Sequence, residues 1–215
     1  MIRNIIFDFM GVIADIDYKK MLNSLSLTDK FKALRLFVKY KTSKELQDTF
    51  DAYQTGYIDI DTVDYLLTRE NHSFNSFVYR LSDAVYNSIT INQKMIKLIH
   101  DLKRDGFNIY LMSNSTPETV DVINAKGLNT MFDGMLLSSK VGVKKPSNTI
   151  FQLSQERLGC EPYKTFFIDD TEENRQTASR LGYRVLPCKK STDAVQNVAN
   201  YFYSNYNLNS DEQEK

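Results

Sequence analysis

The sequence lacks an excess of charge of either sign. Its 215 residues include 27 Lys and Arg and 27 Asp and Glu, so the formal net charge is zero. A balanced charge gives no electrostatic reason to expect binding to nucleic acid or to an anionic membrane surface. We therefore expect neither nucleic acid nor membrane among the partners of this protein.

Cysteine is scarce, and long apolar runs are missing. Cys160 and Cys188 are the only cysteines; two cysteines cannot form a disulfide framework, and their spacing fits no zinc site. Two reduced thiols are typical of a cytoplasmic protein. The first apolar run contains Asp8 and is followed by no small-residue cleavage site, unlike a signal peptide, and no segment approaches the ~18 apolar residues of a membrane span. The sequence thus predicts a cytoplasmic protein.

What the chain has is the composition of an ordinary globular protein, with 42% hydrophobic and 25% charged residues. Such a chain can bury a core, and its length corresponds to one domain or to one domain with an insert. Short apolar runs bounded by Gly, Asp or Ser predict buried strands. These runs are residues 3–8, 107–112, 134–138, 164–168 and 183–187.

Helical patterns lie between these runs. In QKMIKLIHDLKRDGF the apolar residues Met95, Leu98, Ile99 and Leu102 recur at helical spacing, and Gly106 is a natural C-cap. Strands that alternate with helices indicate a parallel sheet covered on both faces. We therefore predict an α/β fold with a Rossmann-like parallel sheet.

The stretch from residue 18 to about residue 90 interrupts this alternation, because it contains helical runs such as YKKMLNSLSL and SKELQDTFDAY and no convincing strand. The simplest organisation is an α/β core of residues 1–14 and 91–207, with a small all-α cap domain of residues 15–90 inserted after the first strand. The last residues, 208–215, are polar and predict a disordered tail.

Polar side chains gather after four of the predicted strands. In an open parallel sheet, ligands bind beyond the carboxyl ends of the strands. One such cluster alone is more typical of a turn or a helix N-cap, but four clusters at one edge indicate a site. The candidates are Asp8, then Ser113 and Asn114, then Lys144 and Lys145, and finally Asp169 and Asp170.

These residue types fit phosphoryl transfer. Three carboxylates, Asp8, Asp169 and Asp170, repel one another unless a cation neutralises them. Hard oxygen ligands without His or Cys point to Mg²⁺. Lys145 and the Ser113 hydroxyl would then hold phosphoryl oxygens, and Asp8 would be free to attack as a nucleophile.

Four ordered motifs, IIFDFMGV, IYLMSN, GVKKPSNTIF and FFIDDTEEN, resemble those of the haloacid dehalogenase (HAD) superfamily. The helical insert after the first motif is similar to the cap of subfamily I, as in sugar-1-phosphate phosphatases and β-phosphoglucomutase-like proteins. The resemblance covers essentially the whole chain. It implies Asp8 as the catalytic nucleophile and Ser113, Asn114 and Lys145 as phosphate-binding residues.

The same resemblance implies a Mg²⁺ site. Its ligands would be Asp8, the backbone carbonyl of Met10 and the acidic pair, with Asp170 in direct contact with the metal and Asp169 acting through water.

The chain departs from the family pattern at Met10. Phosphatases of the superfamily usually carry a second Asp there, which protonates the leaving alkoxide and then activates water. Methionine can do neither, so the general acid/base position is lost. Loss of a positioned acid/base typically costs ~10²–10⁴-fold in rate.

These observations predict a Mg²⁺-dependent phosphatase that forms an aspartyl-phosphate and acts on a small phosphorylated metabolite. A substrate with a good leaving group, such as a sugar 1-phosphate, would need the missing acid least. Two alternatives stay open: a catalytically impaired HAD-like binding or regulatory protein, and a 2-haloacid dehalogenase, whose halide leaves without a proton. We expect a monomer or a homodimer.

Overall fold

The structure of the chain is a computed structural model that describes residues 2–188 and 190–206. The predicted tail, residues 208–215, lies outside the described residues. Among the helices of the described part, none combines the length and the apolarity needed to cross a bilayer.

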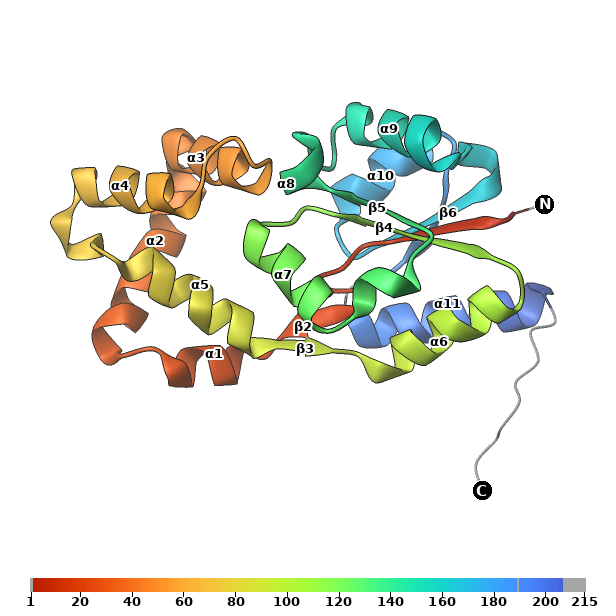
Figure 1. Cartoon of the computed structure of the whole chain (residues 1–215), viewed down its shortest axis with the longest axis horizontal. Helices are drawn as coiled ribbons and strands as arrows, with labels where there is room; N and C mark the ends of the chain where they lie inside the picture. Colours follow the sequence, from red (N-terminus) through yellow and green to blue (C-terminus); the bar gives the residue numbers. More distant parts are fainter. Residues whose placement is uncertain (1, 189, 207–215) are drawn as a thin grey trace, which may run out of the picture.

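A five-stranded parallel sheet forms the core, in the order β5-β4-β1-β6-β7 (Figure 1). Each strand lies at one of the five predicted apolar runs, and the predicted Rossmann-like α/β fold is confirmed. The strands are β1 (Asn4–Phe7), β4 (Asn108–Ser113), β5 (Gly134–Leu137), β6 (Thr165–Asp169) and β7 (Arg184–Pro187).

Alternating side chains of each strand face opposite layers of helices, which is why the strands are apolar throughout. In β1, Ile5 and Phe7 pack with α6, α7 and α11, whereas Ile6 packs with α9 and α10. The two layers lie on opposite sides of the sheet in Figure 1. The helices are α6 (Gln93–Arg104), α7 (Pro117–Ala125), α9 (Asn148–Leu158), α10 (Glu172–Arg180) and α11 (Ser191–Tyr206), with the short α8 (Ser138–Val141), η2 (Leu128–Met131) and η3 (Pro162–Lys164) in the connections.

Five α-helices and one short 3-10 helix lie between the first strand and the rest of the sheet, and we call residues 18–88 the helical segment. The segment has a hydrophobic cluster of its own, which includes Leu46, Val63 and Phe77. It lies beside the sheet, on the left in Figure 1. Its helices are α1 (Tyr18–Ser24), α2 (Leu27–Thr42), α3 (Lys44–Gln54), α4 (Ile60–Glu70), η1 (His72–Phe74) and α5 (Phe77–Ser88).

A two-stranded antiparallel ribbon joins the helical segment to the core. It pairs β2 (Ala14–Ile16) with β3 (Ile89–Ile91). No local pattern predicts β3, because the strand has three residues and its partner lies more than seventy positions away. Both connections of the segment therefore run through one short ribbon.

The helical segment also touches the core through α3 and the turn after it. The Ser138 hydroxyl donates to the carbonyl of Gln54 at 2.6 Å, and the Lys144 ammonium forms an ion pair with Asp51. Gly56 has φ +74° and lies against the carbonyl of Ser139, so a side chain at this position would collide with the core. The turn is thus shaped to fit the core surface.

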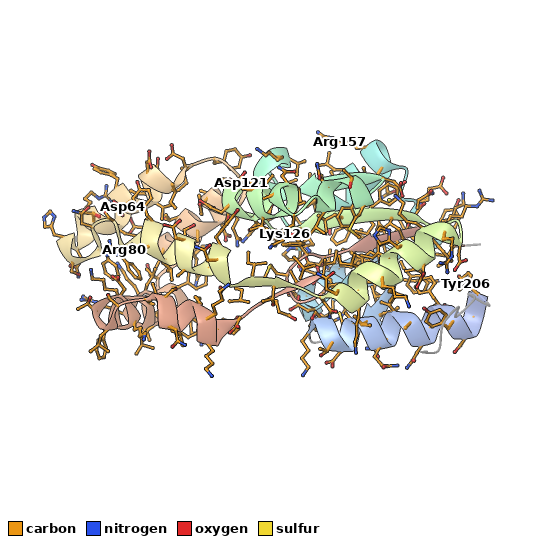
Figure 2. The ribbon with its side chains drawn as sticks, turned by 60° about the horizontal axis from the view of Figure 1, so that its bottom comes forward. Asp64, Arg80, Asp121, Lys126, Arg157 and Tyr206 are labelled. Atoms are coloured by element: carbon orange, nitrogen blue, oxygen red, sulfur yellow. The ribbon has the colours of Figure 1, made fainter. Side chains whose placement is uncertain are left out.

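One ion pair fastens α2 to α5 inside the helical segment. The guanidinium of Arg80, labelled in Figure 2, donates from Nε and Nη2 to the two oxygens of Asp29, each at 3.0 Å. Asp29 is 5% exposed and also accepts from the Ser26 hydroxyl at 2.9 Å. The hydrogen bonds from Arg80 hold the pKa of Asp29 below its ordinary value.

We expect Asp29→Asn to lower the free energy of unfolding by about 1–2 kcal/mol at pH 7, since Arg80 is half-exposed and water screens part of the pair. Because the folded-state pKa of Asp29 is lowered, the contribution is full above the unfolded pKa of about 3.9 and is lost as the pH falls through the folded value. Urea unfolding at a series of pH values measures this.

Asp48→Asn is the matched control, because Asp48 pairs with Lys44 on the exposed surface of α3. The urea midpoint of this variant should equal that of the wild type. An Asp29→Asn midpoint that also equals the wild type, or a difference that persists unchanged far below pH 4, contradicts the assignment.

Candidate active site

Asp8 follows the central strand of the sheet directly. Its backbone N–H donates to the Ile168 carbonyl at 2.8 Å, which continues the β1–β6 pairing, and its side chain accepts from the Phe9 N–H at 2.6 Å. Asp8 is 7% exposed. The chain starts at the far end of the sheet, so β1 runs toward the helical segment and Asp8 lies at the edge that faces it (Figure 1).

Lys145 lies beside Asp8 and is 1% exposed. Its ammonium is 2.8 Å from Asp8 Oδ1 and 2.7 Å from Asp169 Oδ2, and it donates to the Met112 carbonyl at 2.8 Å. All three donors of the ammonium are therefore engaged. Burial alone would lower the pKa of Lys145, but the two carboxylates outweigh it and raise the pKa above its ordinary value.

The two acids of the predicted pair have different environments. Asp169 is fully buried. It accepts four hydrogen bonds or ion-pair contacts in all: two from the Asn174 amide at 3.0 Å, one from the Thr171 N–H at 2.8 Å and one from Lys145. Asp170 is half-buried and receives a 3.4 Å bond from the Thr171 hydroxyl. Asp169 is thus held as a structural anchor, while Asp170 keeps its oxygens toward the cleft.

Asp8, Asp169 and Asp170 bring three carboxylate oxygens within 4.8 Å of one another. Burial raises the pKa of Asp8 to about 7, and Asp169 adds to this rise while Lys145 opposes it. Burial, followed by the charge of Asp169, also raises the pKa of Asp170. Ionising all three groups leaves an excess negative charge that Lys145 alone does not cancel. A hard divalent cation fits this set of oxygens.

The loop after Asp8 completes the same corner. Gly11 has φ +77°, and a Cβ at this position would fill the space that the Asp170 carboxylate occupies. The loop is closed by bonds from the Gly11 N–H to the Ala14 carbonyl and from the Ala14 N–H to the Phe9 carbonyl, at 2.7 and 2.9 Å. The Met10 carbonyl takes no part in these bonds, so it can serve as an oxygen ligand beside Asp170.

The predicted phosphate-binding residues lie along the neighbouring strand ends. Ser113 is buried at the end of β4. Asn114 follows it, and its amide bonds the main chain of Lys145 in both directions, at 2.9 Å to the carbonyl and 2.8 Å from the N–H. Asn114 therefore positions the loop that carries the lysine.

A cleft of about 580 Å³ opens over these groups. It is bounded by the core, by Ile16 of β2 and by Tyr18 at the start of the helical segment. The predicted residues on its wall are Asp8, Met10, Asn114, Lys145 and Asp170. The other two predicted residues, Ser113 and Asp169, are buried and do not line the cleft.

Sequence reasoning missed several residues that support the site. Arg175 is buried and donates to the carbonyls of Asp169, at 2.6 Å, and Cys188, at 3.0 Å, so it fixes the end of β6 against the end of β7. Lys190 lines the cleft as a second cation. Asn174 donates from its amide to both carboxylate oxygens of Asp169 and so supports the acidic pair. No local pattern marks Arg175, because the carbonyls to which it donates follow two different strands, or Lys190, because most of the cleft it lines comes from distant parts of the chain.

The fold and the carboxylates gathered beyond its strand ends define a Rossmann-like α/β protein with an acidic site at the carboxyl edge of its sheet. A model of the haloacid dehalogenase-like hydrolases matches residues 2–182. The chain belongs to this family, and the resemblance of its four motifs is confirmed.

Relatives cover almost the whole chain. A D-ribitol-5-phosphate phosphatase of Bacteroides thetaiotaomicron is 25% identical over 211 residues, which are 92% of this chain and 97% of the relative. A HAD-like hydrolase of Porphyromonas gingivalis superposes with a TM-score of 0.72 at 24% identity, over 99% of this chain and 100% of that one. A HAD family enzyme of B. thetaiotaomicron, crystallised with magnesium and inorganic phosphate, superposes with a TM-score of 0.69 at 22% identity, over 87% of this chain and 94% of that one.

The different environments of the acidic pair lead to a prediction for metal binding. Asp170→Asn should weaken Mg²⁺ binding at least about tenfold, because it removes the most accessible charge among the candidate ligands. The thermal midpoint should stay close to that of the wild type, since Asp170 makes no strong contact that holds the fold. Calorimetric titration with Mg²⁺ measures the affinity.

Glu173→Gln is the control, since Glu173 carries the same charge three residues further on and is exposed. It should bind Mg²⁺ as the wild type does. Equal affinities of the Asp170→Asn variant and the wild type rule out Asp170 as a ligand.

Proposed function

We propose that this protein is a Mg²⁺-dependent phosphatase that acts on a small phosphorylated metabolite through an aspartyl-phosphate on Asp8. The observation that carries the proposal is the convergence of Asp8, Lys145 and Asp170 on one cleft at the carboxyl edge of the sheet. The D-ribitol-5-phosphate phosphatase activity of one relative and the magnesium and phosphate bound to another support it.

The proposal assigns a role to each residue of the site. Asp8 attacks phosphorus, while Lys145, Ser113 and Asn114 form the phosphate-binding group. Lys145 neutralises phosphoryl charge next to the nucleophile, and Asn114 keeps the lysine loop in place. Of the two remaining acids, Asp170 binds the metal directly and Asp169 holds Lys145 and acts on the metal through water.

The Mg²⁺ ion would be held by Asp8, the Met10 carbonyl and the acidic pair. When bound, it neutralises the carboxylates and polarises the phosphoryl group. Its oxygen ligands come from the β1 and β6 ends of the sheet, so the metal site and the nucleophile share one edge.

The reaction has two halves. First, a carboxylate oxygen of Asp8 forms a bond to phosphorus while the bond from phosphorus to the leaving oxygen breaks, and the leaving group takes the electron pair. Then a water oxygen attacks phosphorus, the bond to Asp8 breaks, and phosphate departs while the proton of the water passes to the solvent. Asp8 is regenerated as a carboxylate.

Met10 limits both halves, because a thioether neither donates nor accepts a proton at this position. The proposal therefore includes a leaving group that departs without protonation, such as the anomeric oxygen of a sugar 1-phosphate or an acyl or aryl oxygen. The helical segment supports a cap of residues 15–90 over a core of residues 1–14 and 91–207. We propose that the cap controls access to the cleft.

Asp8→Asn should abolish Mg²⁺-dependent phosphate release from activated phosphate monoesters, because an amide is no nucleophile. The variant should keep the circular dichroism spectrum of the wild type. Phosphate release with and without Mg²⁺ measures the effect, across a panel that includes glucose 1-phosphate and 4-nitrophenyl phosphate.

The same panel separates the proposal from its alternatives. Full activity in Asp8→Asn contradicts the nucleophile. A wild-type protein that binds Mg²⁺ but releases phosphate from no ester is a binding or regulatory protein, and chelator-resistant release of halide from a 2-haloacid identifies a dehalogenase.

With an aryl phosphate, we expect a burst of about one equivalent of phenol followed by slow turnover. A good leaving group needs no acid in the first half, whereas the second half lacks the base that would activate water, so the aspartyl-phosphate accumulates. Stopped-flow absorbance with 4-nitrophenyl phosphate measures the burst.

Met10→Asp should remove the burst and raise steady-state turnover, by up to about 10²-fold on alkyl phosphates and less on aryl phosphates. Met10→Asn is the control, because asparagine has the shape of aspartate but no carboxyl group. If both variants behave as the wild type does, Met10 does not occupy the acid/base position.

A further inference from the structure

An apolar groove of about 510 Å³ lies in the helical segment, between α1, α2, α3 and α5. Nine of its eleven lining residues are apolar or aromatic, and the other two are Lys30 and Gln54. Leu34 and Phe37 on its wall are 60% and 56% exposed. A contiguous apolar patch exposed to water is more often a binding site than the rest of a protein surface is.

The groove shares helix α1 with the cleft over Asp8. Tyr18 lines the cleft, and Met21 and Leu22, three and four residues further along α1, line the groove. This spacing places the three side chains on one face of the helix, so one face of α1 contributes to both the cleft and the groove.

The opposite border of the groove also leads to the site. Gln54 lines the groove and accepts from the Lys144 ammonium at 3.3 Å. The next residue, Lys145, is the lysine that contacts Asp8. Helix α1 and the loop that carries Lys145 thus both connect the groove to the site around Asp8.

The wall of the groove offers few hydrogen-bonding side chains to a leaving group. A sugar or polyol would bury several hydroxyls, and each hydroxyl without a partner weakens binding. The polar groups of the groove's side chains are those of Lys30 and Gln54 and the Tyr40 hydroxyl, and the Gln54 side-chain oxygen is already engaged by Lys144. An aromatic ring with an apolar substituent needs no such partners.

We propose that the groove receives the apolar part of the substrate, and that the substrate is an aryl phosphate whose ring carries an apolar extension. This proposal rests on the proposed phosphatase function and narrows it, because an aryl oxygen also departs without the acid that Met10 does not supply. Asp8 forms the bond to phosphorus, the bond from phosphorus to the aryl oxygen breaks, and the phenolate leaves with the electron pair and takes a proton from water.

A ladder of 4-alkylphenyl phosphates tests the proposal, since the alkyl chain changes apolar length and leaves the phenol acidity nearly constant. The probes are phenyl phosphate and its 4-ethyl, 4-butyl and 4-hexyl derivatives, with glucose 1-phosphate as the polar comparison. Their affinities for the full-length Asp8→Asn variant in Mg²⁺ are measured by calorimetry, and kcat/KM is measured with the wild type. We expect affinity and kcat/KM to rise about threefold for each added methylene.

A matched pair of phenylalanines on α2 distinguishes binding in the groove from nonspecific hydrophobic binding elsewhere on the surface. Phe37 lines the groove and is 56% exposed, whereas Phe31 lies outside it and is 65% exposed. Phe37→Ser should flatten the dependence of affinity on alkyl length. Phe31→Ser should keep the full dependence.

The outcomes separate this proposal from the phosphatase proposal. A rise in affinity with alkyl length supports the groove even if no ester is hydrolysed, in which case the phosphatase function is wrong. Hydrolysis with no dependence on alkyl length, or glucose 1-phosphate bound more tightly than the 4-hexyl ester, overturns the groove proposal and leaves the phosphatase standing. A flat series in which Phe37→Ser, and not Phe31→Ser, splits a dimer in sedimentation identifies the groove as a subunit interface and also overturns it.

Discussion

The ammonium group of Lys145 is buried between the carboxylates of Asp8 and Asp169, and the arrangement of the site depends on this contact. A buried lysine or a buried aspartate alone would be costly, but together they satisfy one another. The contact ties the end of β1 to the end of β6, while the third donor of Lys145 reaches the carbonyl of Met112 in β4. Three neighbouring strand ends are thus held together by one side chain from the loop after β5.

This contact also divides the work of the acidic pair. Asp169 has its oxygens occupied by Lys145, Asn174 and the Thr171 N–H, so it serves the architecture of the site. Asp170, one residue later, turns toward the cleft, and Gly11 leaves it the space to do so. Adjacent residues at a strand end point to opposite sides, which lets one acid anchor the lysine while the other faces a ligand.

Met10 and the apolar groove are independent features that agree in what they favour. In the proposed function, Met10 supplies no proton-transfer group beside Asp8, which favours a leaving group that is stable as an anion. The groove offers few polar partners to a ligand, which favours a leaving group that is apolar. The first feature belongs to the core and the second to the helical segment, and α1 brings the two together.

The local pattern of the sequence was enough to determine the five strands, the helical character of residues 18–88 and the acids, serine and lysine that follow the strands. These features depend on apolar periodicity and on residue type, which neighbouring positions carry. Only the tertiary structure decided that Asp169 is saturated and Asp170 is not, that Arg175 and Lys190 belong to the site, that β3 pairs with β2, and that the exposed residues of α1 and α2 form one groove. Each of these depends on partners far apart in the chain, and a single sequence does not encode such contacts in any local pattern.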